Sequence, residues 1–153
     1  DLNGNTAQSF LNGLASSFVV EKKGKQAYRP SRLHEFGMYL NGQWYILASR
    51  EGTSTKDPIG ILDISILSNN VFDKILDIKD QRTDKRIDFV GGIRGLAELE
   101  KRVDSGEMAV AFSFYPVSIQ QLFDIADSGN VMPPKSTWFE PKLRDGLLTH
   151  LII

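Results

Sequence analysis

The chain has 153 residues, with 18 Lys and Arg against 19 Asp and Glu, so its formal net charge is −1. This balance excludes a general nucleic-acid binder, which needs a basic face. The 41% hydrophobic content predicts a globular domain. Without cysteine, the chain can have no disulfide, thiolate metal site or cysteine nucleophile. No apolar run is long enough to cross a membrane. We therefore expect one domain that binds neither nucleic acid nor membrane.

The N-terminal third predicts a helix and a β-hairpin. Apolar residues at spacings of three and four predict a helix over residues 6–18, capped by Asn5-Thr6, and Phe18-Val19-Val20 predicts a short strand. The basic stretch 21–32 is expected to be a solvated loop whose charge serves solubility. Alternating residues on both sides of Asn41-Gly42 predict a hairpin over residues 35–49, because this dipeptide favours a primed turn.

The middle of the chain predicts a helix followed by an exposed charged segment. Asp57-Pro58 is typical of a helix N-cap and first helical position, and apolar residues continue at helical spacing to Ile78. Asn69-Asn70 can interrupt this helix. Residues 79–86 carry six charges and are expected to be exposed.

The last seventy residues alternate between strand and helix patterns. Two helix ends are marked by glycines, Gly106 and Gly129, and Ser118 with Gln121 forms a capping box. The predicted inward faces of the two helices are Leu96, Leu99 and Val103, and Ile119, Leu122, Phe123 and Ala126. The predicted elements are strands at 87–90, 108–115 and 147–152 and helices at about 92–105 and 118–127.

These elements together predict a single α+β domain over residues 1–153. The C-terminal β-α-β-α-β segment implies parallel strands with right-handed crossovers, whereas the N-terminal hairpin is antiparallel. We therefore expect a mixed sheet of five or six strands with about four helices. The chain starts without an initiator Met and almost directly with a helix, which predicts a piece of a longer protein.

The two histidines predict no metal site. His34 and His150 are far apart in the sequence, and neither belongs to a ligand motif. Alternation in the last strand predicts that His150 is a structural strand residue. His34, beside Glu35 at the mouth of the hairpin, is interpreted as a solvated loop residue, with a functional role as the alternative.

A glycine pair offers a candidate anion site. Gly91-Gly92 joins a predicted strand to a predicted helix, where backbone amides can hold an anion and Arg94 can add a charge-assisted contact. The alternative is a purely structural turn, since glycine adopts positive φ easily.

The proline-rich segment 132–146 is the second candidate. It has three prolines and places Trp138 and Phe139 among charged residues. Long connectors of this kind are often functional, but these aromatics also suit a structural lid packed on the core. The candidate ligand-binding residues of this segment are Lys135, Ser136, Thr137, Trp138, Glu140 and Lys142.

Four segments resemble one family. Residues 57–67, 82–92, 105–112 and 132–144, the last with the word Met132-Pro133-Pro134-Lys135-Ser136-Thr137-Trp138-Phe139-Glu140-Pro141-Lys142-Leu143-Arg144, resemble the C-terminal half of the bacterial and archaeal family called domain of unknown function 1015. The resemblance implies a longer cytoplasmic protein. In that family the N-terminal half holds an Asp-Gly-His-His-Arg-type motif similar to the nucleotide-handling loop of ParB-like and sulfiredoxin-like proteins, some of which are free-serine kinases.

That motif is absent from this chain. The resemblance therefore implies a C-terminal module whose partner is the N-terminal half of its parent, a nucleotide-dependent kinase or hydrolase, and no catalytic residue is carried over. The chain alone shows no acid–base or nucleophile constellation and no cofactor signature.

Two functions follow. In the first, the module binds an anionic small molecule or completes a phosphotransfer site, with Gly91, Gly92, Arg94, Lys135 and Lys142 as contacts and Trp138 as a wall. In the second, it is a non-catalytic packing or dimerisation domain that contacts the other half or a second copy.

Overall fold

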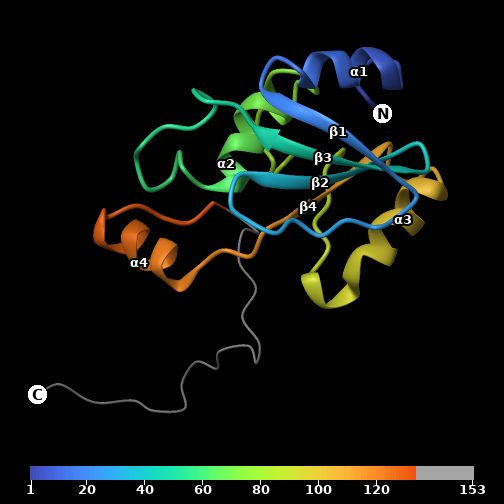
Figure 1. Ribbon diagram of the computed structural model, residues 1–153. Helices are drawn as coiled ribbons and strands as arrows, with labels where there is room; N and C mark the ends of the chain where they lie inside the picture. The colour runs from blue at the N-terminus through green and yellow to red at the C-terminus, as the bar shows by residue number, and fades with distance from the viewer. Residues whose placement is uncertain (134–153) are drawn as a thin grey trace, which may run out of the picture.

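The computed structural model describes residues 1–133, which form a four-stranded antiparallel sheet with helices around it (Figure 1). The strands, in the spatial order β1-β3-β2-β4, are β1 (Phe18–Gly24), β2 (Glu35–Leu40), β3 (Gln43–Ser49) and β4 (Val110–Phe114). The helices are α1 (Ala7–Leu14), α2 (Asp63–Leu67), α3 (Gly95–Asp104) and α4 (Ile119–Asp127), with a π-helix η1 (Ser68–Asp73) and a 3-10 helix η2 (Gly92–Arg94). An α+β fold with four helices is thus confirmed.

The hairpin and the helix caps are as predicted. Asn41 and Gly42 have φ of 49° and 72°, the left-handed values that a primed turn needs. The side chain of Thr6 accepts from Ser9 N at the start of α1. Ser118 and Gln121 form both hydrogen bonds of the capping box of α4. Local signals therefore determine these elements. The strand predicted at residues 18–20 extends further, to Gly24.

Alternation along β2 gives the sheet two different faces. Phe36, Met38 and Leu40 belong to the main hydrophobic core. The remaining residues of this core come from α1, α2, η1 and α4 as well as the sheet: Phe10, Leu14, Phe18, Leu47, Leu62, Ile64, Ile66, Leu67, Val71, Phe72, Leu76, Ile78 and Ile125. These helices therefore cover one face of the sheet.

The opposite face is covered by a loop and by α3. Ser113 Oγ donates to the carbonyl of Tyr28, which brings the loop after β1 across the sheet. Trp44 Nε1 donates to Glu100 at 2.7 Å, and the hydroxyl of Tyr39 donates to Asp104 at 3.0 Å. These two bonds tie α3 to the sheet.

The predicted mixed sheet is wrong for residues 1–133. Every pairing in the described sheet is antiparallel, and residues 87–90 form no strand. In that segment Asp88 Oδ1 accepts from Phe89 N at 2.8 Å, so a local side chain, and not a neighbouring strand, satisfies this amide. Arg102 forms an ion pair with Asp88 and holds the segment to α3. The strand predicted at 147–152 lies outside the described residues, and four strands are observed where five or six were expected.

The helix predicted from Pro58 starts later, and its second half is a π-helix instead of an α-helix. Asp57 Oδ1 accepts from Ile59 N and Gly60 N, but this forms only a turn, and α2 begins at Asp63. After α2 the chain becomes π-helical, because the side-chain amide of Asn70 donates to the carbonyl of Ile66, four residues earlier. The asparagine pair thus marks an irregularity instead of a break.

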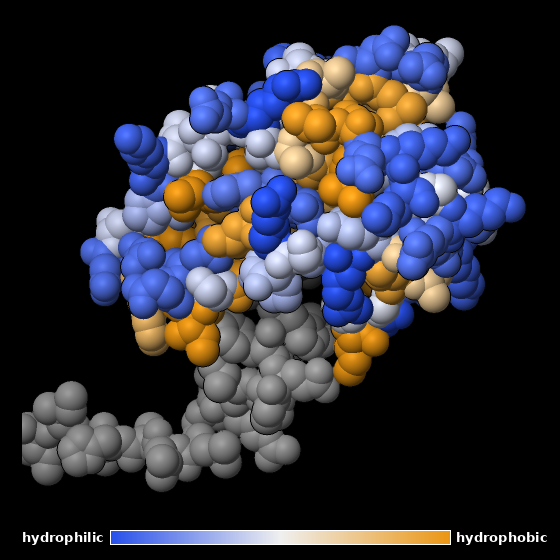
Figure 2. Space-filling model, in the orientation of Figure 1, coloured by the Kyte–Doolittle hydropathy of each residue, from blue (hydrophilic) through white to orange (hydrophobic). Residues whose placement is uncertain are grey.

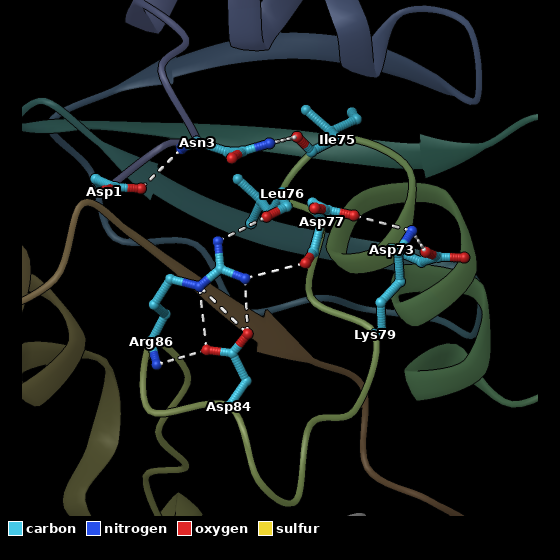
Figure 3. Close-up of polar contacts among 9 residues, drawn as sticks. All are labelled: Asp1, Asn3, Asp73, Ile75, Leu76, Asp77, Lys79, Asp84 and Arg86. Atoms are coloured by element: carbon cyan, nitrogen blue, oxygen red, sulfur yellow. Dashed lines mark hydrogen bonds and ion pairs between the residues drawn. The ribbon is translucent and has the colours of Figure 1, made fainter.

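The charged segment after η1 is pinned to the preceding chain (Figure 3). Arg86 donates from Nη1 to the carbonyl of Leu76 and from Nη2 to that of Asp77, both at 3.0 Å, and pairs with Asp84 at 2.6 Å. Lys79 pairs with Asp77 at 3.0 Å. The prediction of simple exposure is therefore incomplete, since Arg86 binds the backbone carbonyls of Leu76 and Asp77.

The predicted inward face of α4 is partly wrong. Ile119 and Phe123 are 68% and 59% exposed, and the buried residue is Ile125. The helix packs on the core along one edge of its apolar face. None of the residues of α3 is fully buried, although its predicted end at Gly106, with φ of 79°, is confirmed. Within residues 1–133, no helix has the length and apolarity to cross a membrane.

Candidate functional site

The predicted anion corner is only partly present. Gly91 precedes η2, which contains Gly92 and Arg94, and α3 follows without a side-chain N-cap. The preceding strand is missing. Arg94 faces carboxylates: the hydrogen bond from Arg102 is the main cause of the lowered pKa of Asp88, and the charge of Arg94 adds to it.

The other predicted ligand contacts, Lys135, Ser136, Thr137, Trp138, Glu140 and Lys142, lie outside the described residues. The same is true of His150. The choice between a binding loop and a structural lid for residues 132–146 therefore stays a prediction. Among residues 1–133 there is no cluster of three potential metal ligands.

The structure reveals a different polar site around His34. Asp63, at the start of α2, lies beside His34, which immediately precedes β2. Its Oδ1 accepts from the backbone N–H of His34 at 2.8 Å and lies 3.1 Å from the ring nitrogen Nδ1. One carboxylate oxygen thus holds both the main chain and the imidazole of the same residue.

The carboxylate of Asp63 is almost fully buried. Its side chain is 7% exposed, and burial raises its pKa while the contacts from His34 oppose that rise. Its second oxygen, Oδ2, is buried without a hydrogen-bond partner in the described part of the chain. An orphaned buried oxygen is costly and needs a specific explanation, such as stored strain or a catalytic role.

His34 has the arrangement of an oriented proton carrier. With Asp63 accepting at Nδ1, the neutral ring carries its proton there and leaves Nε2 as a base. None of residues 1–133 forms a hydrogen bond to Nε2, and the side chain is 35% exposed. His34 also has φ of 65°, which is uncommon for a residue with a side chain. Asp63 fixes both this backbone conformation and the ring.

A second buried carboxylate shapes the loop that leads to His34. Glu35 accepts hydrogen bonds from the hydroxyl of Tyr28, from the backbone and hydroxyl of Ser31, and from Arg32 Nε at 3.3 Å. Burial alone raises its pKa, but the bonds from Tyr28 and Ser31 outweigh this and leave the pKa lowered. We call these four residues, Tyr28, Ser31, Arg32 and Glu35, the Glu35 clasp. The clasp holds the basic loop in place beside His34.

Two arginines lie on chain segments that adjoin His34: Arg32, two residues before it, and Arg50, next to Ser49. Arg32 uses Nε in the clasp and is 74% exposed. Ser49 N donates to the carbonyl of His34 at 2.9 Å, and Arg50 follows directly, with its Nε bonded to the carbonyls of Ala15 and Phe18. Each guanidinium keeps terminal N–H groups that no side chain in residues 1–133 engages.

A shallow hollow lies elsewhere, between the hairpin turn and the end of α3. It is lined in part by Asp104, Glu107 and Met108. Its carboxylates make it unsuitable for an anion, and neither His34, Arg32 nor Arg50 lines it.

The comparisons connect this region to a family. Residues 1–65 match the family model described as Protein of unknown function (DUF1015), which confirms the predicted resemblance to this family. The match contains His34, Glu35 and Asp63. It does not extend to the C-terminal segments that carried most of the resemblance, so placement in the C-terminal portion of a parent stays a prediction. No curated protein and no solved structure matches the chain.

The importance of Asp63 was missed in the sequence. Its signal was an acidic residue among Ile61, Leu62 and Ile64, where a carboxylate is easily buried. His34 was identified but interpreted as solvated, because its partner lies 29 positions away.

Proposed function

We propose that this chain is a module that binds an anionic small molecule beside His34 and moves a proton there. The single observation that carries the proposal is the buried carboxylate of Asp63, whose Oδ1 contacts both the backbone N–H and the Nδ1 of His34. This is how proteins orient an imidazole for general acid–base chemistry.

The roles follow from the geometry. Nε2 of His34 accepts a proton from a hydroxyl group of the substrate or from a water molecule next to the substrate. The imidazolium that forms is stabilised by Asp63. Asp63 is a positioning residue, since its buried carboxylate acts through the ring. The same imidazolium returns the proton to the leaving oxygen or to water, so the pair ends in its starting state.

The charge of the ligand is inferred from the arginines on the chain segments that adjoin His34. Arg32 and Arg50 come from the two segments that border His34, and planar guanidiniums suit carboxylates and phosphates. The resemblance to the family adds a phosphate group to this proposal, because the N-terminal half in that family holds a motif similar to a nucleotide-handling loop. We therefore propose that the module contributes to a phosphotransfer site completed by the N-terminal half of a longer cytoplasmic parent.

The alternative site for the same anion is the glycine corner. Its contacts would be Gly91, Gly92 and Arg94, together with Lys135 and Lys142. Arg94 adds to the lowering of the pKa of Glu98, where the hydrogen bond from Arg102 is the main cause. Asp88 near this corner is 53% exposed and competes with a bound anion, whereas the carboxylates beside His34, Asp63 and Glu35, are buried, which favours the His34 end of the sheet.

The test is a thermal-shift screen of the full chain against inorganic phosphate, phosphoserine, ADP and ATP. A ligand at about 100 times its Kd stabilises the folded state by about 2.7 kcal/mol, which raises Tm by roughly 5–10 °C in a domain of this size. Arg32→Ala and His34→Asn should abolish the shift, whereas the matched variant Arg94→Ala should retain it. Loss of the shift in Arg94→Ala alone moves the site to the glycine corner.

The absence of a shift with every probe refutes anion binding by this chain and leaves the packing or dimerisation function. Light scattering then decides its form. A dimer supports contact between two copies, and a monomer supports contact with another part of the parent protein.

A further inference from the structure

The segment that leads to His34 concentrates positive charge. Residues 22–34 contain five basic residues and no aspartate or glutamate. The basic residues are Lys22, Lys23, Lys25, Arg29 and Arg32, and all five are exposed. Since the whole chain has a net charge of −1, the residues outside this segment sum to −6. Such an asymmetry raises the local concentration of anions at the basic surface.

The connection between β1 and β2 spreads part of this charge along the length of the sheet. Phe18 and Glu35 both pair with β3 near its C-terminal end. Gly24 pairs with Trp44 near the other end. The chain after Gly24 therefore runs back over the length of β1, which has 7 residues and spans about 20 Å. Figure 1 shows this connection crossing the near side of the sheet, and Figure 2 shows mostly hydrophilic surface across the middle of that side.

Three cations follow one another on this return path. Lys25 stands at its start, Arg29 follows four residues later, and Arg32 comes three residues after that. Arg32 is also two residues before His34. We call Lys25, Arg29 and Arg32 the cationic track. Its positive charge therefore leads along the chain to the candidate site.

The backbone of the cationic track is fastened to the sheet. The carbonyl of Tyr28, the residue before Arg29, accepts from Ser113 Oγ at 3.2 Å, and the hydroxyl of Tyr28 donates to Glu35. The backbone N–H of Ser31, the residue before Arg32, donates to the same carboxylate at 3.1 Å. A ligand therefore does not have to order this backbone when it binds, which lowers the entropic cost of binding.

The cations of the track are available to a ligand among the described residues. Within residues 1–133, the side chains of Lys25 and Arg29 form no hydrogen bond and no ion pair. Arg32 uses Nε toward Glu35 at 3.3 Å and is 74% exposed. Guanidiniums bind phosphate groups through pairs of N–H donors, and lysines bind them as point charges. The track therefore suits a ligand that carries several phosphates in a row.

We propose that the ligand of the His34 site is an oligophosphate, either inorganic or part of a nucleotide. Its terminal phosphate lies beside His34 and Arg32, and its further phosphates follow the track toward Arg29 and Lys25. A single phosphate cannot extend along a path of about 20 Å, whereas a chain of phosphates can. This inference rests on the function proposed above, and it adds Arg29 and Lys25 as the residues that select for the length of the phosphate chain.

The experiment is calorimetric titration of the full chain at pH 7 with inorganic phosphate, tripolyphosphate and ATP. Tripolyphosphate should bind roughly tenfold more tightly than phosphate, because each further phosphate gains an exposed ion pair. Arg29→Gln should weaken the binding of tripolyphosphate about fivefold and leave that of phosphate unchanged. The matched control is Lys74→Gln, which removes an exposed cation directly after η1, on the helices that cover the other face of the sheet. It should change neither affinity.

The possible results separate this inference from the proposed function. If neither phosphate nor tripolyphosphate binds, both are overturned. If tripolyphosphate binds but Arg29→Gln does not weaken it, or Lys74→Gln weakens it equally, the track is overturned and the anion site at His34 stands. A hexaglutamate peptide that binds as tightly as tripolyphosphate, with the same dependence on Arg29, assigns the track to an acidic protein partner and refutes the proposal.

The comparison of ATP with tripolyphosphate identifies the source of the phosphate chain. Tighter binding of ATP supports a nucleotide, and equal binding supports the phosphate chain alone. Equal Tm values for Arg29→Gln, Lys74→Gln and the unsubstituted chain show that the affinities are compared between folded proteins. Both variants should fold, because neither side chain forms a hydrogen bond or an ion pair within residues 1–133.

Discussion

Asp63 holds His34 by its backbone and its ring at once, with 2.8 Å from Oδ1 to the main-chain nitrogen and 3.1 Å to Nδ1. The contact joins the start of β2 to the start of α2, two elements that are distant in sequence. It also compensates the left-handed backbone of His34, a conformation that costs roughly 1–2 kcal/mol for a residue with a Cβ. The same buried carboxylate therefore stabilises the backbone of His34 and orients its imidazole ring.

The first prediction concerns the pH dependence that Asp63 creates. Burial raises its pKa in the folded state, so between the unfolded value, about 3.9, and the higher folded value the folded chain binds more protons than the unfolded chain. The contribution of Asp63 to stability is therefore present at low pH and is lost as the pH rises through the folded pKa.

Asp63→Asn should remove this decline while it keeps an oxygen that accepts from His34. The free energy of unfolding, measured by urea denaturation from pH 4 to pH 8, should fall less steeply for the variant than for the unsubstituted chain. Parallel pH profiles would mean that Asp63 titrates as an exposed carboxyl does.

The second prediction has the opposite sign and concerns the Glu35 clasp. Although burial opposes ionisation, the bonds from Tyr28 and Ser31 leave the pKa of Glu35 lowered. Its contribution is therefore present above the unfolded pKa, about 4.3, and is lost as the pH falls through the folded value. At pH 7, Glu35→Gln should cost about 1–3 kcal/mol, since it weakens several hydrogen bonds to a buried charge.

The cost of Glu35→Gln should shrink as the pH falls below the unfolded pKa and through the lower folded pKa of Glu35, because only below both values is the carboxyl neutral in both states. Glu21→Gln, at an exposed position of β1, is the control and should change stability by less than about 0.5 kcal/mol at any pH. A loss that does not vary with pH would assign the effect to packing and not to charge.

Local signals predicted more of this fold than long-range ones. The turn at Asn41-Gly42 and the caps at Thr6 and Ser118 depend on residues within four positions of each other, and all are confirmed. The strand at 87–90 was wrong because its alternation is a local pattern, whereas a strand needs a neighbour. Asp88 and Arg102 satisfy that segment in another way.

The candidate site was harder to predict for the same reason. His34 was visible as a residue, but its interpretation depended on Asp63, which the fold brings near from another element. The inward face of α4 shows the same limit: periodicity identified the apolar residues but not which edge of them meets the core, where Ile125 packs.

The third prediction concerns a close approach at Gly37, in the middle of β2. A Cβ on this residue would lie 2.7 Å from the carbonyl oxygen of Tyr28, and backbone cannot move as a flexible side chain can. Gly37→Ala should therefore destabilise the fold by about 1–3 kcal/mol, as overpacking does. It should also loosen the loop that carries the Glu35 clasp.

Gly92→Ala is the matched control, because a Cβ at Gly92 meets nothing within 4 Å. Its effect should be within about 0.5 kcal/mol. Urea denaturation of both variants provides the comparison. Equal stability of the two would show that the loop lies further from the sheet than Gly37 and Tyr28 indicate.

The last prediction tests how α3 is fastened to the sheet. Trp44 is fully buried, and its Nε1 donates to Glu100 at 2.7 Å. Glu100→Leu removes the acceptor and leaves a buried N–H without a partner, which should cost about 1–3 kcal/mol. Glu100→Gln keeps an acceptor oxygen and should recover most of that loss. Lys101→Leu, an exposed position on the same helix, controls for the added apolar surface. If Glu100→Leu and Lys101→Leu unfold at the same urea concentration, the bond to Trp44 does not stabilise the contact between α3 and the sheet.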